Sequence, residues 1–421
     1  MTSNDNPSNP CYAALIGLDW GDTQHAIALQ SVQTQEMETT TLEHSPEAVH
    51  AWLKELEERF GGRPVAVALE TSKGPLIHMF FDVPWLRVYP IHPATSTRMR
   101  KAFKPSGAKD DEPDAKVLLN LLITHLHQLR PLAVQDSSTR NLGRRCELRR
   151  SSVDQRTQLT NHMTAVLKSY FPQALELVGD ALYSPLALEF LKRWPDLIAL
   201  KASRPATLRR FYYEHNVRSP SLVSQRLEVV ARAVALTTDE VIVQCGQEEL
   251  ARLIELLAVL QKHIRQDDQL IAEAFAAHPE ADLFRDLPGA GPAMAPRLLV
   301  AFGTDRNLYP TCQSFQLYSG VAPVTEKSGN RRWVHWRWNA PRFLRQSLIE
   351  WAGLTVKYCH WAKAYYRQQK RRGKNRWTIL RSLAFIWIRI LWKCWQTHTP
   401  YNEKRYVDTL RRRGSSLVQP A

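Results

Sequence analysis

The sequence predicts an α/β domain, followed by a helical middle region and a mainly helical C-terminal region. Strand-like and helix-like segments alternate over the first 120 residues, whereas long helical periodicity begins near residue 139. With 421 residues, the chain is too long for one ordinary hydrophobic core. We therefore expect an α/β domain at 1–130, a helical stalk with an insertion at 131–280, a C-terminal domain at 281–412 and a disordered tail at 413–421.

The N-terminal domain begins with three strand-like segments. Residues 12–21, 25–32 and 37–44 are apolar or β-prone, and short polar turns separate them. Turns this short join antiparallel neighbours. The three segments are therefore predicted to form an antiparallel meander.

A helix and two further strands complete the predicted sheet. Residues 45–60 have helical apolar spacing, and the glycine pair that starts at Gly61 ends this helix. Residues 64–70 and 85–91 are mostly apolar and are predicted to be strands. Strands and a helix in this order predict one α/β sheet domain.

Two long helical stretches follow. One runs from about 139 to 170, and the other covers 247–275 with apolar residues near heptad spacing. The pair suits an antiparallel coiled-coil stalk, although two helices packed in an ordinary core fit nearly as well. Residues 174–240 are predicted to form a less regular helical insertion, for which the sequence indicates no role.

Charge is distributed unevenly along the chain, whose net charge is +15. Residues 1–120 hold 11 Lys and Arg against 16 Asp and Glu, whereas residues 281–421 hold 25 against 7. The two regions therefore carry net charges of about −5 and +18. An acidic first domain joined to a strongly basic last region indicates a polyanionic partner held near a carboxylate site.

The spacing of the cysteines and the character of the apolar segments indicate the cellular compartment of the protein. The six cysteines form no CxxC pair, which argues against a zinc site or disulfide framework and fits a reducing cytoplasm. The first ten residues lack the basic and apolar regions of a signal peptide. The apolar stretch 379–395 contains Arg381, Arg389 and Lys393, so it is too short and too charged to span a bilayer. We expect a cytoplasmic protein without membrane contact.

Acidic residues close two of the predicted strands. Asp19 ends the first strand and Glu70 the fourth, and neighbouring strand ends meet at one edge of a sheet. Asp111 and Asp114 lie three residues apart at a predicted helix start, which puts them on one helix face. Four converging carboxylates repel one another unless cations neutralise them, and oxygen-rich sites of this kind suit Mg²⁺ or Mn²⁺.

The order of these features points to a class of nucleases. A strand that ends in Asp, a three-stranded meander, a helix, a strand that ends in Glu and a helix-borne Asp-x-x-Asp are typical of an RNase H-like core. Two metal ions about 4 Å apart in such a site activate a nucleophile and stabilise a leaving oxygen in phosphodiester chemistry.

The acidic cluster at residues 110–114 also has a simpler interpretation. Acidic residues at a helix start cap free amides and offset the positive end of the helix dipole. Pro113 suits the first helical turn, where its missing N–H is not needed. On this interpretation the cluster is only a solvated helix start.

Three segments resemble the catalytic blocks of DEDD-type insertion-sequence transposases with a RuvC-like domain, the IS110 family, also described as bridge-RNA-guided recombinases. They are IGLDWGDTQHAIAL at 16–29, VALETSKG at 67–74 and KDDEPDAKVL at 109–118. The family's last block usually reads Lys-Thr-Asp-x-x-Asp-Ala. This alignment implies Asp111 and Asp114 as metal ligands and leaves Asp110 as an extra acid, which with Glu112 supplies capping charge.

The resemblance extends to a serine nucleophile in the C-terminal region. YSGVAP at 318–323 and KSGN at 327–330 resemble a family block, and within it Ser328 matches the nucleophile best, with Ser319 and Ser314 as alternatives. The sequence departs from the pattern at Asn330, where a second glycine is usual. No role is therefore carried over to residues 333–341.

A glycine-containing segment and a basic stretch are candidate nucleic-acid contacts. Gly289 and Gly291 are predicted to form a tight hairpin that leads into a helix whose amides hold a DNA phosphate, or else a helix-turn-helix that only packs. The segment 367–376 has six basic residues in ten, with aromatic residues nearby, which favours nucleic acid over a solvated face. The tryptophans of 387–395 are expected in the core. The candidate contacts are Gly289, Gly291, Arg331, Arg332, Lys370, Arg371, Arg372, Lys374 and Arg376.

Three functional hypotheses follow. The first is a metal-dependent DNA transposase or recombinase, for which the resemblance implies serine-mediated cleavage, a site built from two protomers of a dimer or tetramer, and donor and target DNA recognised through a guide RNA. The second is a RuvC-like structure-specific endonuclease that uses activated water and needs no serine. The third is a non-catalytic nucleic-acid-binding scaffold, against which the presence of all four acids argues.

Overall fold

The computed structural model describes residues 11–70, 74–103, 111–337 and 340–418. The chain divides into two compact units, Met1–Val134 and Gln135–Ala421, which we call the first and second unit and describe separately. The division lies close to the end of the predicted α/β domain. None of the helices in the described ranges is long and apolar enough to cross a membrane.

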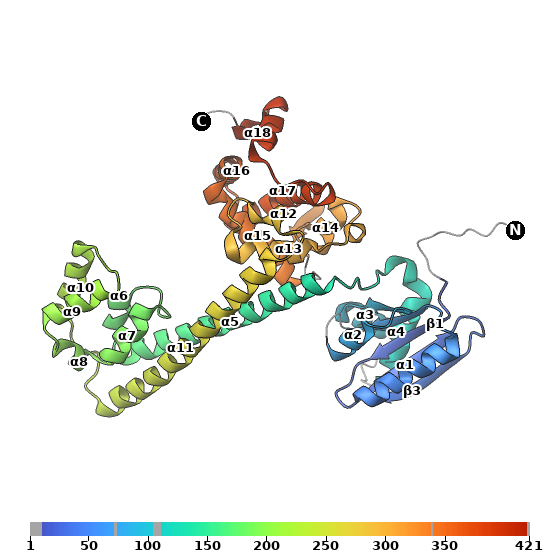
Figure 1. Ribbon diagram of the computed structural model, residues 1–421, viewed down its shortest axis with the longest axis horizontal. Coiled ribbons are helices and arrows are strands. Elements are labelled where there is room, and N and C mark those ends of the chain that lie inside the picture. The colour runs from blue at the N-terminus through green and yellow to red at the C-terminus, as the bar shows by residue number, and fades with distance from the viewer. Residues whose placement is uncertain (1–10, 71–73, 104–110, 338–339, 419–421) are drawn as a thin grey trace. The chain divides into compact units, whose positions relative to one another are not determined.

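The first unit contains a mixed five-stranded sheet in the order β3-β2-β1-β4-β5 (Figure 1). The first three strands form the predicted antiparallel meander, whereas β4 pairs in parallel with β1 and with β5. The strands are β1 (Ala14–Asp19), β2 (Gln24–Ser31), β3 (Met37–Glu43), β4 (Val65–Leu69) and β5 (Leu86–Pro90).

Helices cover both faces of this sheet. Ile16 and Leu18 of β1 pack in one core with α1 (Pro46–Phe60) and α2 (Pro75–Phe80). The alternate residue Leu15 packs in the core on the opposite face, which α4 covers. Around α4 (Asp111–His125) lie α3 (Pro93–Phe103) and the 3-10 helix η1 (Leu126–Gln128). The first unit is therefore a three-layered α/β domain.

The second unit begins with two long helices, α5 (Ser137–Tyr170) and α11 (Glu240–Ala276). Each begins at an aspartate, Asp136 or Asp239, whose side chain accepts from a first-turn amide. Arg149 pairs with Asp268 at 2.8 Å, and His162 pairs with Glu249 at 2.8 Å. Because partner numbers fall on α11 as they rise on α5, the helices are antiparallel.

Buried residues on α11 follow a regular interval. Leu250, Leu257, Ile264 and Ile271 are buried seven residues apart. Near the far end, Gly246 leaves room for Tyr170, since a Cβ there would lie 2.6 Å from the tyrosine ring. The interval is typical of a coiled coil, which we retain as a prediction for this helix pair.

A helical cap of five short helices joins the far ends of α5 and α11. Ser184-Pro185 and Ser219-Pro220 each start a helix, and both serine side chains accept from amides of the first turn. The cap has its own core, built around Phe190, Phe211 and Tyr212. Its helices are α6 (Gln173–Val178), α7 (Pro185–Arg193), α8 (Leu197–Lys201), α9 (Pro205–Glu214) and α10 (Pro220–Arg232).

The C-terminal region of the second unit is mainly helical and contains one hairpin of two strands. Its helices are α12 (Ala281–Arg285), α13 (Gly291–Phe302), α14 (Cys312–Tyr318), α15 (Arg342–Tyr358), α16 (His360–Arg371), α17 (Arg376–Gln396) and α18 (Glu403–Arg412), with 3-10 helices η2 (Arg306–Leu308) and η3 (Ser416–Val418). The strands β6 (Val324–Ser328) and β7 (Arg331–His335) form the hairpin.

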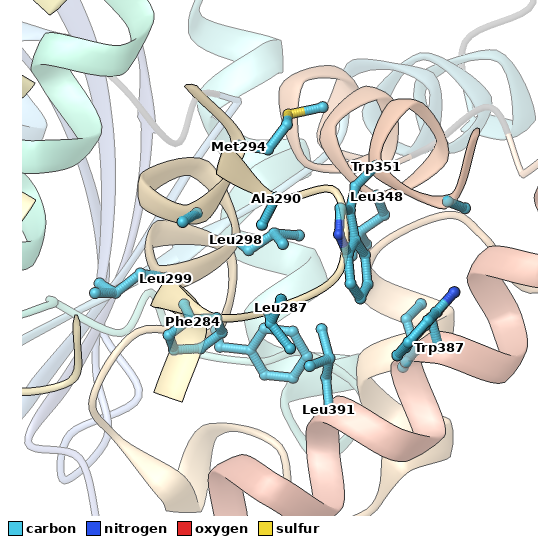
Figure 2. Packing of buried hydrophobic residues seen from close by; sticks show 14 of the residues in the cluster. Phe284, Leu287, Ala290, Met294, Leu298, Leu299, Leu348, Trp351, Trp387 and Leu391 are labelled. Atoms are coloured by element: carbon cyan, nitrogen blue, oxygen red, sulfur yellow. The ribbon is translucent and has the colours of Figure 1, made fainter. Parts of the chain in front are cut away.

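Tryptophans fill the core of this region, as predicted. Figure 2 shows side chains from α12, α13, α15 and α17 converging on it. Trp351 and Trp387 lie 4.7 Å apart between ring centroids, and their indole N–H groups donate to Pro288 O and Thr355 Oγ1. Leu142 of α5 belongs to the same core. The predicted stalk and C-terminal domain thus share one core, although the sequence placed a boundary near residue 280.

Three elements were not predicted, and one prediction, the disordered tail, needs correction. Helices α2 and α3 and the β6–β7 hairpin were not predicted. Within the predicted disordered tail, Ser416–Val418 form η3, and Gln368 Nε2 donates to Ser416 Oγ at 3.1 Å. Residues 419–421 lie outside the described ranges. The tail is ordered to that point because η3 packs on α16 and α18.

Candidate functional site

Asp19 and Glu70 lie side by side at the carboxyl end of the sheet. Asp19 is the last residue of β1, and Glu70 follows the last residue of β4. Leu18 pairs with Leu69 in the parallel register, so the next residue of each strand is an acid. Neighbouring strands are about 4.8 Å apart. Both acids are half-buried at the same edge of the sheet, and their role as metal ligands stays a prediction.

Helix α4 brings a third carboxylate to this end of the sheet. A Cβ on Gly17 of β1 would lie 2.0 Å from Ala115 O and 2.4 Å from Leu119 N. The α4 backbone therefore rests directly on β1, two residues before Asp19. Asp114, which precedes Ala115, lies in the first turn of α4 and is half-buried.

Helix α3 supplies polar partners to two of the three acids. The Ser96 hydroxyl, which is 1% exposed, donates to Glu70 Oε1, and Arg100 Nε forms an ion pair with Asp114 Oδ1. Ser96 and Arg100 are four residues apart and so share one face of α3. This face orients the Glu70 carboxylate and neutralises Asp114.

Asp111, the fourth predicted ligand, is the first residue of α4. The side chains of Asp111 and Glu112 and the whole of Asp110 lie outside the described part of the chain. In that described part, no group of three or more His, Cys, Asp or Glu side chains is arranged to hold a metal ion. The side chains that the sheet edge and α4 supply are carboxylates, whose oxygens suit the preference of Mg²⁺ and Mn²⁺.

A histidine pair fixes the turn that follows Asp19. His25 is fully buried, and its Nδ1 accepts from the Gly21 amide at 3.2 Å. Nε2 therefore carries the proton and faces His44 Nδ1 at 3.0 Å. Burial, and then the charge of His44, lower the pKa of His25 below its ordinary value of 6.5. Trp20 contacts both rings at centroid distances of 5.5 and 5.0 Å.

Ser328 lies at the tip of an exposed hairpin in the second unit. It ends β6 and pairs in register with Arg331, the first residue of β7. Gly329 has a φ of +55°, a left-handed conformation that the two-residue turn requires. Ser328, Arg331 and Arg332 are all exposed, so a serine hydroxyl and two guanidinium groups occupy one end of this hairpin.

The two alternative serines have structural partners. Ser314 is buried and forms a capping box with Thr311 at the start of α14. Ser319 is fully buried, and its hydroxyl donates to Gln316 O at 3.1 Å. Neither hydroxyl faces solvent, whereas Ser328 does. Exposure therefore favours Ser328 among the three.

The glycine-containing segment lies at the start of α13. Gly289 and Gly291 have φ values of +71° and +54°, and the predicted hairpin is a short connection between the helices α12 and α13. A Cβ on Gly289 would lie 3.1 Å from the Leu354 backbone, so this glycine packs against α15. A Cβ on Gly291 meets nothing within 4 Å. The packing role is present at Gly289, and phosphate binding by α13 stays a prediction.

The predicted basic stretch joins α16 to α17 and is exposed. Its five predicted contacts are Lys370, Arg371, Arg372, Lys374 and Arg376. Gly373, with a φ of +75°, turns the chain between them. The Arg376 guanidinium lies 5.8 Å from the ring of Trp377, which is 61% exposed. An exposed aromatic ring beside exposed cations suits single-stranded nucleic acid.

Sequence reasoning missed Ser96, Arg100 and the His25–His44 pair. The segment 93–103 is polar and has no long apolar stripe, so nothing in it predicts a helix beside the acids. His25 offered a weak signal, because it stands in an otherwise apolar strand at a position that points inward. A buried polar residue next to a candidate ligand indicates a partner.

Two family models match the chain. Residues 16–172 match the DEDD transposase model of IS110, described as a transposase, and residues 281–367 match the transposase IS116/IS110/IS902 family. The first match contains Asp19, Glu70, Asp111 and Asp114, and the second contains Ser328.

Two of three named relatives match most of the chain. A mini-circle putative transposase for IS117 from Streptomyces coelicolor is 26% identical over 92% of this chain and 95% of its own length. An insertion element IS110 protein of 43.6 kDa from the same organism is 25% identical over the same shares. Putative transposase y4uE of Sinorhizobium fredii is 29% identical over 49% of this chain and 57% of its own length. The chain belongs to the IS110 family of insertion-sequence transposases and is a DNA transposase.

Proposed function

We propose that this transposase cuts and rejoins DNA with a metal-binding site of Asp19, Glu70, Asp111 and Asp114 and with Ser328 as the nucleophile. The observation that carries the proposal is the backbone placement of the acids: Asp19 and Glu70 follow paired positions of β1 and β4, and Asp114 lies in the first turn of α4, whose backbone rests on β1. The strand order β3-β2-β1-β4-β5, with an antiparallel meander followed by two parallel strands, supports an RNase H-like, RuvC-like fold.

The donor set fits divalent Mg²⁺ or Mn²⁺. Carboxylate oxygens on two strands and a helix form a hard-donor site, which soft metals do not prefer. Bound ions of this kind polarise the phosphate and make the attacking oxygen more acidic. Ser96 holds the Glu70 carboxylate in one orientation, and Arg100 balances the charge of Asp114. These two α3 residues act by positioning the acids.

The serine step exchanges one phosphodiester bond for another. The Ser328 oxygen bonds to phosphorus, one phosphorus–oxygen bond to deoxyribose breaks, the serine proton leaves to solvent and the leaving oxygen takes up a proton. A serine hydroxyl is weakly nucleophilic at neutral pH and requires activation. Ser328 belongs to the second unit and the acids to the first, so the proposal requires them to meet on DNA, within one protomer or between two.

The proposed partners are donor and target DNA, a guide RNA and further copies of the chain in a dimer or tetramer. The net charge of about +18 on residues 281–421 supports a nucleic-acid partner. The exposed cations of the β6–β7 hairpin and of the segment Lys370–Arg376 place part of that charge on the protein surface. The guide RNA and the oligomer rest on the family resemblance.

A RuvC-like hydrolase is the second candidate function. The acids at the sheet edge suit water-based cleavage equally well, and that reaction needs no serine. The exposed position of Ser328, paired with Arg331 at the start of β7, favours the transfer reaction. The two reactions differ in whether protein becomes attached to DNA.

The deciding experiment traps the reaction under denaturing conditions with labelled DNA. We expect a protein–DNA adduct that is lost in Ser328→Ala and kept in Thr325→Ala, a matched hydroxyl deletion at an exposed position of the same strand. Asp114→Ala is expected to abolish cleavage, whereas Asp110→Ala keeps it. Cleavage by Ser328→Ala at the native rate, without an adduct in the native protein, would establish the hydrolase instead.

A further inference from the structure

A large groove lies between α17 and α18, away from the predicted contacts. Its volume is about 970 Å³, at the upper end of the range for ligand-binding pockets. The C-terminal half of α17, the connection 397–402 and one face of α18 line it. None of the nucleic-acid contacts predicted from the sequence belongs to this lining.

The floor of the groove is apolar and aromatic. Ile386, Ile390 and Cys394 follow one another at four-residue intervals, so they form one stripe on α17. Tyr401 and Tyr406 lie opposite and are held in place by the buried Trp361. Trp361 Nε1 donates to the Tyr401 hydroxyl at 3.1 Å, and its ring lies 5.0 Å from that of Tyr406 between centroids. The aromatic floor is therefore preformed.

The groove carries only positive formal charge. No aspartate or glutamate lines it. The four cations that do are Arg389, Lys393, Arg405 and Arg413. All four are exposed, and none forms an ion pair with a carboxylate in the described part of the chain. Burial raises the pKa of Tyr406, while the charges of Arg389 and Arg413 lower it, which is consistent with both guanidinium groups facing the floor.

We propose that this groove binds a single strand of nucleic acid, with bases on the tyrosine and isoleucine floor and phosphates on the four cations. The inference deepens the proposed function by adding a binding site to it. Unpaired cations around a groove without acids complement a phosphodiester chain. An apolar floor with two preformed aromatic rings suits exposed bases, whose faces are available in a single strand and stacked away in a duplex.

Two charge-matched pairs of substitutions on α18 test the proposal. Arg405→Glu with Arg413→Glu reverses two groove cations, whereas Lys404→Glu with Arg412→Glu reverses two exposed cations of the same helix outside the groove. Both pairs change the net charge by the same amount. Fluorescence anisotropy of the full chain with labelled 15-nucleotide strands of DNA and of RNA measures affinity, with 15-base-pair duplexes as the comparison.

The groove pair is expected to weaken single-strand binding about tenfold more than the outer pair. For two lost phosphate contacts, the slope of log affinity against log salt should fall by about 1.4. Ile390→Asn, which makes the floor polar without changing charge, should also weaken single-strand binding while leaving the circular dichroism spectrum unchanged. Preference for the DNA or the RNA strand identifies which strand occupies the groove, and either result supports the proposal.

Any of three results would overturn the proposal. The first is an equal loss of single-strand affinity for the two charge pairs, and the second is duplex binding with the same sensitivity to the groove pair. The third is displacement of the strand by poly-glutamate at equal charge concentration. The assay needs neither metal nor Ser328. It is run in the Asp114→Ala chain without Mg²⁺, so failure of the groove proposal is distinguishable from failure of the proposed cleavage chemistry.

Discussion

Gly17 lies so close to Ala115 that any side chain at position 17 would collide with the α4 backbone; the distance from an added Cβ to Ala115 O is 2.0 Å. This contact sets the spacing between β1, which ends in Asp19, and the first turn of α4, which carries Asp114. The obstacle is backbone, which cannot turn aside as a flexible side chain does. Position 17 therefore controls the distance between two proposed metal ligands.

Gly17→Ala is expected to reduce both stability and cleavage. Overpacking of this kind costs about 1–3 kcal/mol and here displaces α4 from the sheet. Hydrogen exchange in the full chain, read at β1 and α4, measures the loss, and a DNA cleavage assay measures the effect on the site. Gly353→Ala in α15 is the control, because its Cβ meets Leu380 at an ordinary 3.5 Å. Unchanged exchange in β1 and α4 of Gly17→Ala would contradict the packing argument.

Arg100→Gln is expected to make the first unit depend on Mg²⁺ for stability. The variant removes the ion pair between Arg100 and Asp114, which costs about 1.5–3 kcal/mol without metal. Because a bound ion stabilises the folded state by mass action, added Mg²⁺ should restore part of this loss. Thermal unfolding with and without Mg²⁺ measures the difference.

Arg98→Gln is the matched control for that measurement, since Arg98 is exposed on the same helix. It should leave both stability and the Mg²⁺ response as in the native chain. Equal Mg²⁺ responses in Arg100→Gln and Arg98→Gln would show that Arg100 does not substitute for a metal beside Asp114.

The His25–His44 pair predicts acid sensitivity of the turn after Asp19. The pKa of His25 is lower in the folded protein than its ordinary 6.5, so the unfolded chain takes up a proton first as the pH falls. The stabilisation that neutral His25 contributes is complete above about pH 6.5 and is lost progressively below it. Protonation at Nδ1 removes the acceptor of the Gly21 amide.

Histidine Cε1–H resonances followed by NMR over pH 5–8 measure this pKa directly. His44→Gln should raise the pKa of His25, because it removes the second cause of the shift. His25→Gln should flatten the pH dependence of β1 and β2 stability below pH 6.5. A His25 resonance that titrates at or above 6.5 in the native chain would contradict the prediction.

The sequence predicted the sheet edge better than its surroundings. Asp19 and Glu70 each close an apolar strand, and strand pairing alone brings them together. The partners Ser96 and Arg100 depend on how α3 packs, which its polar sequence does not encode in any periodic pattern. Their roles become visible only when tertiary contacts are known.

The hairpin at Ser328 has a local sequence signal. Gly329 and Asn330 form a two-residue turn between β-prone segments, which is a recognised hairpin pattern. The strands are exposed on both faces and lack apolar alternation, so hydrophobic periodicity does not predict them.

The groove between α17 and α18 has no comparable signal in the sequence. Its two walls meet only through the packing of Tyr401 and Tyr406 on Trp361.

The antiparallel pairing of α5 and α11 means that the chain enters and leaves the helical cap at the same end of the pair. The 34 residues of α5 span about 50 Å, at about 1.5 Å per residue. Removing seven residues from each helix at the same level would bring the cap about 10 Å nearer to the C-terminal core and keep the buried positions of α11 aligned. The length of the pair is thus a spacing that evolution or design can change in seven-residue increments without altering either hydrophobic core.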